Sequence, residues 1–340
     1  MIMEAAEPLA VARARPTLTL GRAILLVGIL LAIAVPFAAK SFLVFQLTLV
    51  LVYAIAICGL NLLTGFNGQF SLGHGAFYAI GAYTAAILME HGGVSYVWTI
   101  PAAGLVCFIA GFLFGLPALR LEAIYLALAT FALAIAAPQI LKLSPLEHWT
   151  GGVQGIVILK PDAPFGLPLN QDQWLYFFTL GVALAMFFAA HNLVHSRTGR
   201  AIMAIRDNPI AARSMGINTA LYKTLTFGFS ALYTGAAGAL GAIVVQFVAP
   251  DSFTFSLSIA FLVGLVVGGV GWIPGALFGG AFVLFVPNIA EHISKGLSGA
   301  AYGVILILLI YLMPSGAGGF FQLLANRAAK WRRRPREERT

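Results

Sequence analysis

Side chains able to carry out catalysis or hold a metal ion are few in this sequence, and their spacing matches no motif for either task. The chain has no G-x-x-x-x-G-K-[ST] phosphate-binding loop and no H-E-x-x-H zinc motif, so we do not expect it to hydrolyse ATP itself. His191 and His195 are spaced as neighbours on a helix, but no third ligand accompanies them. Cys58 and Cys107 lie inside apolar runs, as small buried residues do. We therefore expect neither an enzyme nor a bound metal or cofactor.

The polar groups that stand out lie in a glycine-rich stretch, residues 59–83, which reads GLNLLTGFNGQFSLGHGAFYAIGAY. Glycine lets a helix break, and broken helices expose backbone dipoles with which transporters handle polar solutes. Close helix packing through small residues explains the glycines equally well. For the polar side chains we favour a solute pathway or a structural turn over lipid contact, because an unpaired polar group in hydrocarbon is costly. The candidate residues are Asn61, Gly65, Gln69, Ser71, Gly73, His74 and Gly75.

A second glycine-rich stretch begins at Gly264 and reads GLVVGGVGWIPGALFGGAFV. Its Gly-Trp-Ile-Pro turn separates two apolar runs, so it predicts a second broken pair of helices over about 255–270 and 274–289. Together the two stretches are candidates for the wall of a translocation path. The residues that the second stretch contributes are Gly268, Gly271, Pro274 and Gly275.

A long basic segment, residues 196–223, reads SRTGRAIMAIRDNPIAARSMGINTALYK and is too polar to span a membrane. Arg200 to Ile205 predicts one short helix, and Asn208 followed by Pro209 predicts a capped start of another. Small residues after that cap would leave a flat face suited to a cleft in a soluble partner. The residues alone leave a second explanation open, in which the segment is a basic loop that only fixes topology.

The elements that must position these residues are transmembrane helices. Hydrophobic residues make up 60% of the 340 residues and charged residues 9%, against roughly 25% charged in soluble domains. The apolar runs are apolar on every face, which indicates helices and not barrel strands. We predict an all-α polytopic bundle of about eight to ten spans, depending on whether the broken pairs cross fully. The expected spans cover 23–39, 42–63, 75–89, 96–116, 121–141, 174–194, 224–246, 255–270, 274–289 and 299–313.

Charge patterning predicts the topology. The net charge is +8, and the basic residues gather in an N-terminal tail (1–22), in 196–223 and in a C-terminal tail (314–340). Cytoplasmic segments retain Lys and Arg, so we expect both termini and 196–223 in the cytoplasm and the loop 142–173 outside. The permease domain then covers 23–313, and its first helix is retained and not cleaved as a signal peptide. A basic tail in so apolar a chain is better explained by topology than by nucleic-acid binding.

The predicted spans are nearly free of ionisable residues. Glu90, Arg120, Glu122 and Glu291 all fall at predicted helix ends. Ion-coupled carriers place such groups inside their spans, where the coupling takes place. The sequence therefore disfavours a secondary transporter acting alone, and it contains no constellation for a membrane-embedded enzyme.

Three strings resemble the permease subunits of branched-chain amino-acid ABC importers, the LivM type: GLNLLTGFNGQFSLGHGAFYAIGAYTAA, TGGVQGI at 150–156, and TGRAIMAIRDNPIAARSMGI. The resemblance covers roughly residues 42–315. It implies a bacterial inner-membrane importer with two permease chains, two cytoplasmic ATPases that use ATP and Mg²⁺, and an external solute-binding protein. It implies leucine, isoleucine, valine or similar amino acids as substrates, and related permeases for urea and short amides give an alternative.

The same resemblance implies that the permease contacts its ATPase through an E-A-A-x-x-x-G-like loop. Ala211, Ala212 and Gly216 match its A-A-x-x-x-G part, but Ile210 stands where the glutamate would be. The nearest charged residues that could replace that glutamate precede the cap. The coupling residues expected from the resemblance are Arg206, Asp207, Asn208, Ala211, Ala212 and Gly216.

Overall fold

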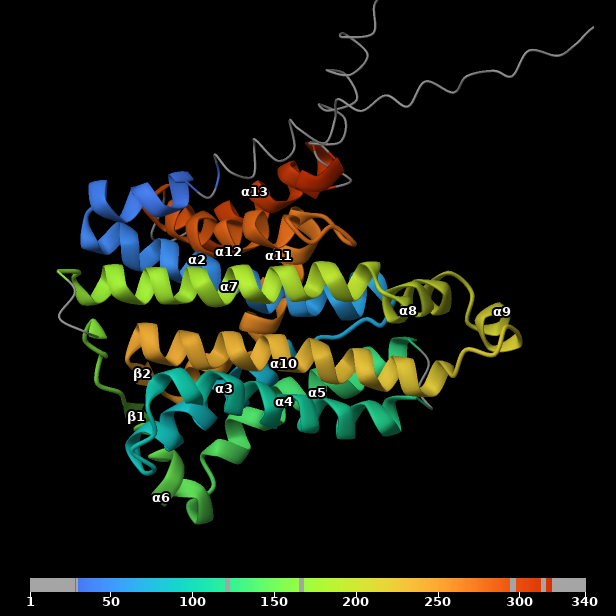
Figure 1. Cartoon of the computed structure of the whole chain (residues 1–340), viewed down its shortest axis with the longest axis horizontal. Helices are drawn as coiled ribbons and strands as arrows, with labels where there is room; N and C mark the ends of the chain where they lie inside the picture. Colours follow the sequence, from blue (N-terminus) through green and yellow to red (C-terminus); the bar gives the residue numbers. More distant parts are fainter. Residues whose placement is uncertain are drawn as a thin grey trace, which may run out of the picture.

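The computed structural model describes residues 28, 30–119, 123–164, 168–293, 298–312 and 316–319, and these ranges form a bundle of helices (Figure 1). The all-α bundle predicted from the sequence is confirmed. Residues 1–22, residues 23–27 of the first expected helix and most of the tail 314–340 lie outside the described ranges. After helical residues 30–38, the chain forms α2 (Ser41–Leu60), η1 (Asn61–Phe66), α3 (His74–Glu90), α4 (Tyr96–Ala118), α5 (Ala123–Leu141), η2 (Ser144–Leu146), α6 (Glu147–Thr150), β1 (Ile156–Val157), α7 (Gln171–His195), α8 (Arg197–Asp207), α9 (Pro209–Ser214), α10 (Thr219–Val245), β2 (Phe247–Val248), η4 (Pro250–Phe253), α11 (Phe255–Gly268), α12 (Gly275–Ile293) and α13 (Ser298–Leu312).

Five of the described helices are long and apolar enough to cross a membrane, judged by length and composition. They are α2 continued by η1, α4, α5, α7 and α10. The second broken region gives two shorter apolar helices, α11 and α12, as its glycine-rich stretch predicts. The total number of crossings stays a prediction.

α10 is the central helix of the bundle (Figure 1). In its most apolar stretch 83% of the residues are buried, compared with 28% in α5 and α7, which leave most of their surface for lipid. Helices in a bilayer associate through close van der Waals packing and not through exclusion of water. Small residues make this possible: a Cβ atom on Gly235 of α10 would lie 2.5 Å from the Cβ of Cys107 in α4.

The predicted loop 142–173 is folded onto one end of the bundle. β1 pairs antiparallel with β2, so that Ile156 lies opposite Val248, and Lys142 forms an ion pair with Asp251 at 2.5 Å. Gln246 links α10 to this ribbon in the left-handed conformation, with φ of 66°. The loop is thereby tied to the segment that follows α10.

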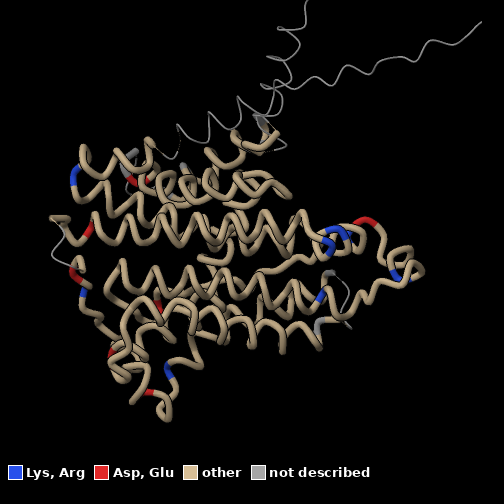
Figure 2. Tube along the Cα trace, in the orientation of Figure 1, with Lys and Arg blue, Asp and Glu red and all other residues tan. Residues whose placement is uncertain are grey.

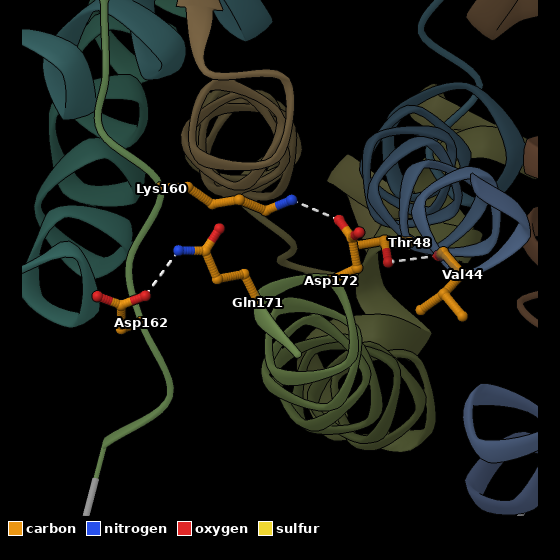
Figure 3. Close-up of polar contacts among 6 residues, drawn as sticks. All are labelled: Val44, Thr48, Lys160, Asp162, Gln171 and Asp172. Carbon is orange, nitrogen blue, oxygen red and sulfur yellow. Dashed lines mark hydrogen bonds and ion pairs between the residues drawn. The ribbon is translucent and has the colours of Figure 1, made fainter. Parts of the chain in front are cut away.

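A second set of polar contacts ties the same loop to α7 (Figure 3). Lys160 pairs with Asp172, and Gln171 donates to Asp162 at 2.6 Å. In the same view Thr48 turns its hydroxyl onto the Val44 carbonyl of its own helix, α2, at 2.8 Å.

α7 begins three residues before the predicted Trp174. A capping box of Asn170 and Gln173 fixes this start, with the Asn170 N–H donating to Gln173 Oε1 at 3.1 Å. The Asn-x-x-Gln pattern was visible in the sequence and was missed there.

The charged residues lie mostly at the two ends of the bundle (Figure 2). α8 and α9 project from the end opposite to β1, β2 and α6 (Figure 1). The segment 196–223 and the loop 142–173 therefore occupy opposite ends, as expected if they face opposite sides of a membrane. Which end faces the cytoplasm stays a prediction.

Candidate functional site

The first broken region begins where α2 widens into the π-helix η1. Residues 67–73 are not helical, and α3 starts at His74, so the break lies within the predicted interval of Gly65 to Gly75. π-turns are rare and occur frequently at functional sites. A bond from the Gln69 N–H to the Leu63 carbonyl, 3.1 Å long, closes the turn after η1.

Ser71 and His74 belong to a chain of buried hydrogen bonds. The Ser230 hydroxyl of α10 donates to the Gly59 carbonyl of α2 at 2.6 Å, so it must accept the proton of His74 Nε2, 2.7 Å away. His74 Nδ1 lies 3.0 Å from the Ser71 hydroxyl. The chain joins α2, α3 and α10 around His74, which is 1% exposed.

The Ser230→Ala substitution tests this chain. It leaves the His74 N–H and the Gly59 carbonyl without their buried partner, which is expected to reduce stability by about 1–3 kcal/mol. The melting temperature of the purified protein in detergent measures the effect. Thr226→Val is the control, because the Thr226 hydroxyl bonds only the Tyr222 carbonyl of its own helix, at 2.7 Å. Equal melting temperatures for the two variants would refute a structural role of the chain.

The glycines of the first region lie where neighbouring helices approach the backbone. A Cβ atom on Gly73 would lie 2.9 Å from the Thr130 carbonyl of α5. One on Gly75 would lie 2.7 Å from Ser258 Oγ of α11, which accepts from the Gly75 N–H at 2.8 Å. These contacts support the close-packing explanation of the two glycines.

The second broken region consists of α11, a turn over residues 269–274, and α12. Gly271 has a φ of 77°, a conformation that favours glycine. The ends of the two helices touch: a Cβ atom on Gly268 would meet the Gly275 carbonyl, and one on Gly275 would meet the Gly268 carbonyl. Pro274 is exposed at the start of α12.

Asn61 joins the two broken regions. Its Nδ2 donates to the Trp272 carbonyl at 3.0 Å, and its Oδ1 accepts from the Gly271 N–H at 2.8 Å. Gly65 lies directly against this pair, since a Cβ there would meet Asn61 Oδ1 and lie 2.7 Å from the Gly271 nitrogen. The sequence singled out three of these residues separately but gave no sign that they meet.

The basic segment folds into α8 and α9, as predicted. Asn208 caps α9 by accepting from the N–H groups of Ile210 and Ala211, both at 3.0 Å, and Pro209 follows it. Gly216 follows the end of α9 and has a φ of 83°. A Cβ atom added there would have no heavy atom within 4 Å, so the backbone conformation and not the packing favours glycine at this position.

The prediction of a small, flat, exposed face after this cap is wrong in one respect. Ala211 is exposed, but Ala212 is only 4% exposed and lies against the chain itself. The exposed large apolar side chains here are Ile210 in α9 and Met215 directly after it, which are 79% and 83% exposed. Sequence reasoning missed both, because an apolar residue in a short amphipathic segment is normally expected inside.

Arg206 connects the basic segment to the first broken region. Its Nη1 donates to the Gly65 carbonyl at 3.0 Å, while Nε and Nη2 donate to Asp207 Oδ1 at 3.0 and 2.9 Å. Gln69 makes a second connection, from its Nε2 to the Lys223 carbonyl at 3.2 Å. The two groups of candidate residues, chosen independently, are thus in contact.

Metal-binding groups are absent from the described part of the chain: no cluster of three or more His, Cys, Asp or Glu residues occurs there. The cysteines Cys58 and Cys107 are buried and not paired with each other. The arrangement that these contacts define is one of broken helices joined to a basic segment.

Comparison with known proteins agrees with this arrangement. Residues 42–313 match a family described as "Branched-chain amino acid transport system / permease component". The chain is 34% identical to the high-affinity branched-chain amino acid transport system permease protein LivM of Escherichia coli (strain K12), over 88% of this chain and 75% of that one. It is 26% identical to the LivH permease protein of Salmonella typhimurium, over 78% of this chain and 91% of that one. No solved structure matches the chain significantly.

Proposed function

Because the chain belongs to the family of permease components of branched-chain amino acid transport systems, we propose that it forms one half of the translocation path of an ATP-driven importer. Its substrates are branched-chain or similar amino acids received from an external solute-binding protein. The ATP and Mg²⁺ are used by two ATPase subunits, and this chain hydrolyses nothing. It resides in the inner membrane of a bacterial cell.

The second half of the path is a related permease chain. The chain resembles proteins named LivM and proteins named LivH, each described as a permease of a high-affinity branched-chain amino acid system. Two such chains side by side would form the path between them, with the solute-binding protein on the end formed by 142–173 and the ATPases on the end formed by 196–223.

One observation carries the proposal: a basic segment with an exposed apolar tip is bonded directly to a broken helix. The tip residues Ile210 and Met215 give a soluble partner apolar surface to bury, and Arg206 reaches from the same segment to Gly65. Closure of the ATPases would move this segment, and the broken helices would then change the side to which the path opens.

The proposal is tested by purifying the tagged chain from its native membrane. We expect it to bring with it a second permease and two ATPases, and the reconstituted complex to take up labelled leucine when given the binding protein and ATP. Uptake by this chain alone, driven by an ion gradient, would replace the proposal with a secondary transporter. ATP-driven uptake of urea without uptake of leucine would support the role as an importer permease but would replace branched-chain amino acids by urea as the substrate.

The docking role of α9 predicts the effect of a charge at its tip. Ile210→Asp and Met215→Asp place a carboxylate on apolar surface that the ATPase would bury, so we expect each to reduce recovery of the ATPase by about tenfold, at a cost of 1–3 kcal/mol for an unpaired buried polar group. Recovery is measured by quantitative immunoblot of the affinity-purified complex.

Val157→Asp is the matched control. Val157 is an exposed apolar residue too, at 68%, but it lies on β1 at the opposite end of the bundle. ATPase recovery with this variant should equal that of the unmodified chain. If all three variants recover the ATPase equally, α9 is not the docking element.

A further inference from the structure

The side chain of Arg206 touches the first broken region with both its head and its stem. Nη1 donates to the Gly65 carbonyl at 3.0 Å. The stem packs on Gly68, where a Cβ atom would lie 2.9 Å from Arg206 Cγ and where φ is 73°. Movement of the end of α8 therefore cannot leave residues 65–68 in place without breaking a hydrogen bond and opening a packed contact.

Asp207 aims the guanidinium group of Arg206. Its Oδ1 accepts from Nε and Nη2, at 3.0 and 2.9 Å, which leaves Nη1 directed at the Gly65 carbonyl. The side chain of Asp207 is 66% exposed and that of Arg206 39% exposed, so the ion pair itself contributes little to stability. The ion pair instead fixes the orientation of the Arg206 guanidinium group, because this planar group can take only one orientation when two of its N–H donors bond the same carboxylate.

The Gly65 peptide is in turn adjacent to one of the hydrogen bonds that join the broken regions. It is the fifth residue of η1, and the last carbonyl groups of a helix have no partner within the helix, so this oxygen is available to an arginine. The same residue lies against the Asn61–Gly271 hydrogen bond, which is 2.8 Å long. A displacement of Gly65 must shift Asn61, and through it the turn between α11 and α12.

We propose that Arg206 is the positioning residue through which movement of the segment 196–223 reaches both broken regions, and that Asp207 holds it in the effective direction. This inference rests on the proposed function, because it assigns the route by which the ATPases act on the path. The contacts run from α8 to Gly65, from Gly65 to Asn61, and from Asn61 to Gly271 and Trp272.

The experiment compares Arg206→Met with the unmodified chain in the complete importer, reconstituted in proteoliposomes with its binding protein. Methionine keeps an apolar stem on Gly68 and removes the donor to Gly65. We expect the complex to assemble and to hydrolyse ATP, while leucine taken up per ATP hydrolysed falls about tenfold, the typical effect of losing a hydrogen bond from a charged donor.

Arg200→Met is the control. Arg200 lies on the same helix and also donates to a backbone carbonyl, that of His195 at 3.2 Å, but this acceptor belongs to α7 and not to a broken region. Uptake per ATP should be unchanged in this variant. Arg206→Lys should recover part of the lost uptake, because an ammonium group can reach the Gly65 carbonyl but cannot engage Asp207 through a fork.

The outcomes separate the inference from the function on which it rests. If Arg206→Met assembles and its uptake per ATP equals that of the unmodified complex, the inference is wrong and the proposed function stands. If the variant loses the ATPase, Arg206 is a docking residue and the inference is also wrong. If the unmodified chain purifies without any ATPase, the proposed function and the inference fail together.

Discussion

Gly81→Ala is expected to destabilise the protein strongly, because the added methyl group has no room between α3 and α10. A Cβ atom on Gly81 of α3 would collide with the Gly235 carbonyl oxygen of α10 and lie 2.5 Å from its Cα and 2.6 Å from its carbonyl carbon. All three atoms belong to the backbone, so no side chain can turn aside to make room. The two helices must separate, and overpacking of this kind costs about 1–3 kcal/mol, and more where the backbone has to move.

The matched control is Gly181→Ala in α7. Gly181 lies in a helix interior like Gly81, but an added Cβ would have no heavy atom within 4 Å. We expect this variant to be as stable as the unmodified chain or slightly more so, because alanine is favoured over glycine in a helix by roughly 0.5–1 kcal/mol.

The measurement is the fraction of detergent-solubilised protein that stays monodisperse in gel filtration after heating. The temperature at half loss should fall by several degrees for Gly81→Ala and stay constant for Gly181→Ala. A similar fall in both would mean that the loss of stability does not come from the contact between α3 and α10.

Local features of the sequence predicted local structure well. Asn208 followed by Pro209 predicted the start of a helix, and α9 begins at Pro209 with Asn208 as its cap. The breaks after α2 and α11 follow from glycine and proline in the same way. Each of these features depends on backbone conformation close to the residue that causes it, so a single sequence is enough to find it.

Partners distant in the chain could not be predicted in this way. His74 bonds Ser230, which is 156 residues away, and Asn61 bonds Gly271, which is 210 residues away. Nothing in the residue types selects these partners from the many other polar residues. The packing of the helices around α10 determines which polar residues meet, and that packing cannot be deduced from the residue types of a single sequence.

The exposed surface of α9 was mispredicted for a different reason. The sequence predicted an exposed face of small residues that includes Ala212, yet Ala212 is buried and the larger Ile210 is exposed. The usual pattern, in which large apolar side chains are buried, assumes that the isolated chain is the folding unit. A chain that completes its surface with a second protein breaks the pattern at the contact, and the proposed ATPase interface is such a place.

Asn61→Leu is expected to have the second large effect, because the Asn61 side chain makes two hydrogen bonds that join the first broken region to the turn between α11 and α12. Leucine has a similar volume but neither donates nor accepts. The Gly271 N–H loses its acceptor and the bond to the Trp272 carbonyl is lost, at about 1–3 kcal/mol for each buried group affected. We expect a lower melting temperature and a loss of leucine uptake greater than the loss of assembled complex.

Asn67→Leu is the control, since it makes the same change directly after the end of η1. Asn67 is 2% exposed and Asn61 1% exposed, but neither the amide nitrogen nor the amide oxygen of Asn67 has a hydrogen-bond partner among the described residues. Replacing a buried amide without partners by an apolar side chain is expected to be neutral or stabilising. If Asn61→Leu melts and transports like Asn67→Leu, the bond between the broken regions is dispensable. If only Asn61→Leu loses uptake, transport depends on the hydrogen bonds of Asn61 to the turn between α11 and α12, because these bonds are the difference between the variants.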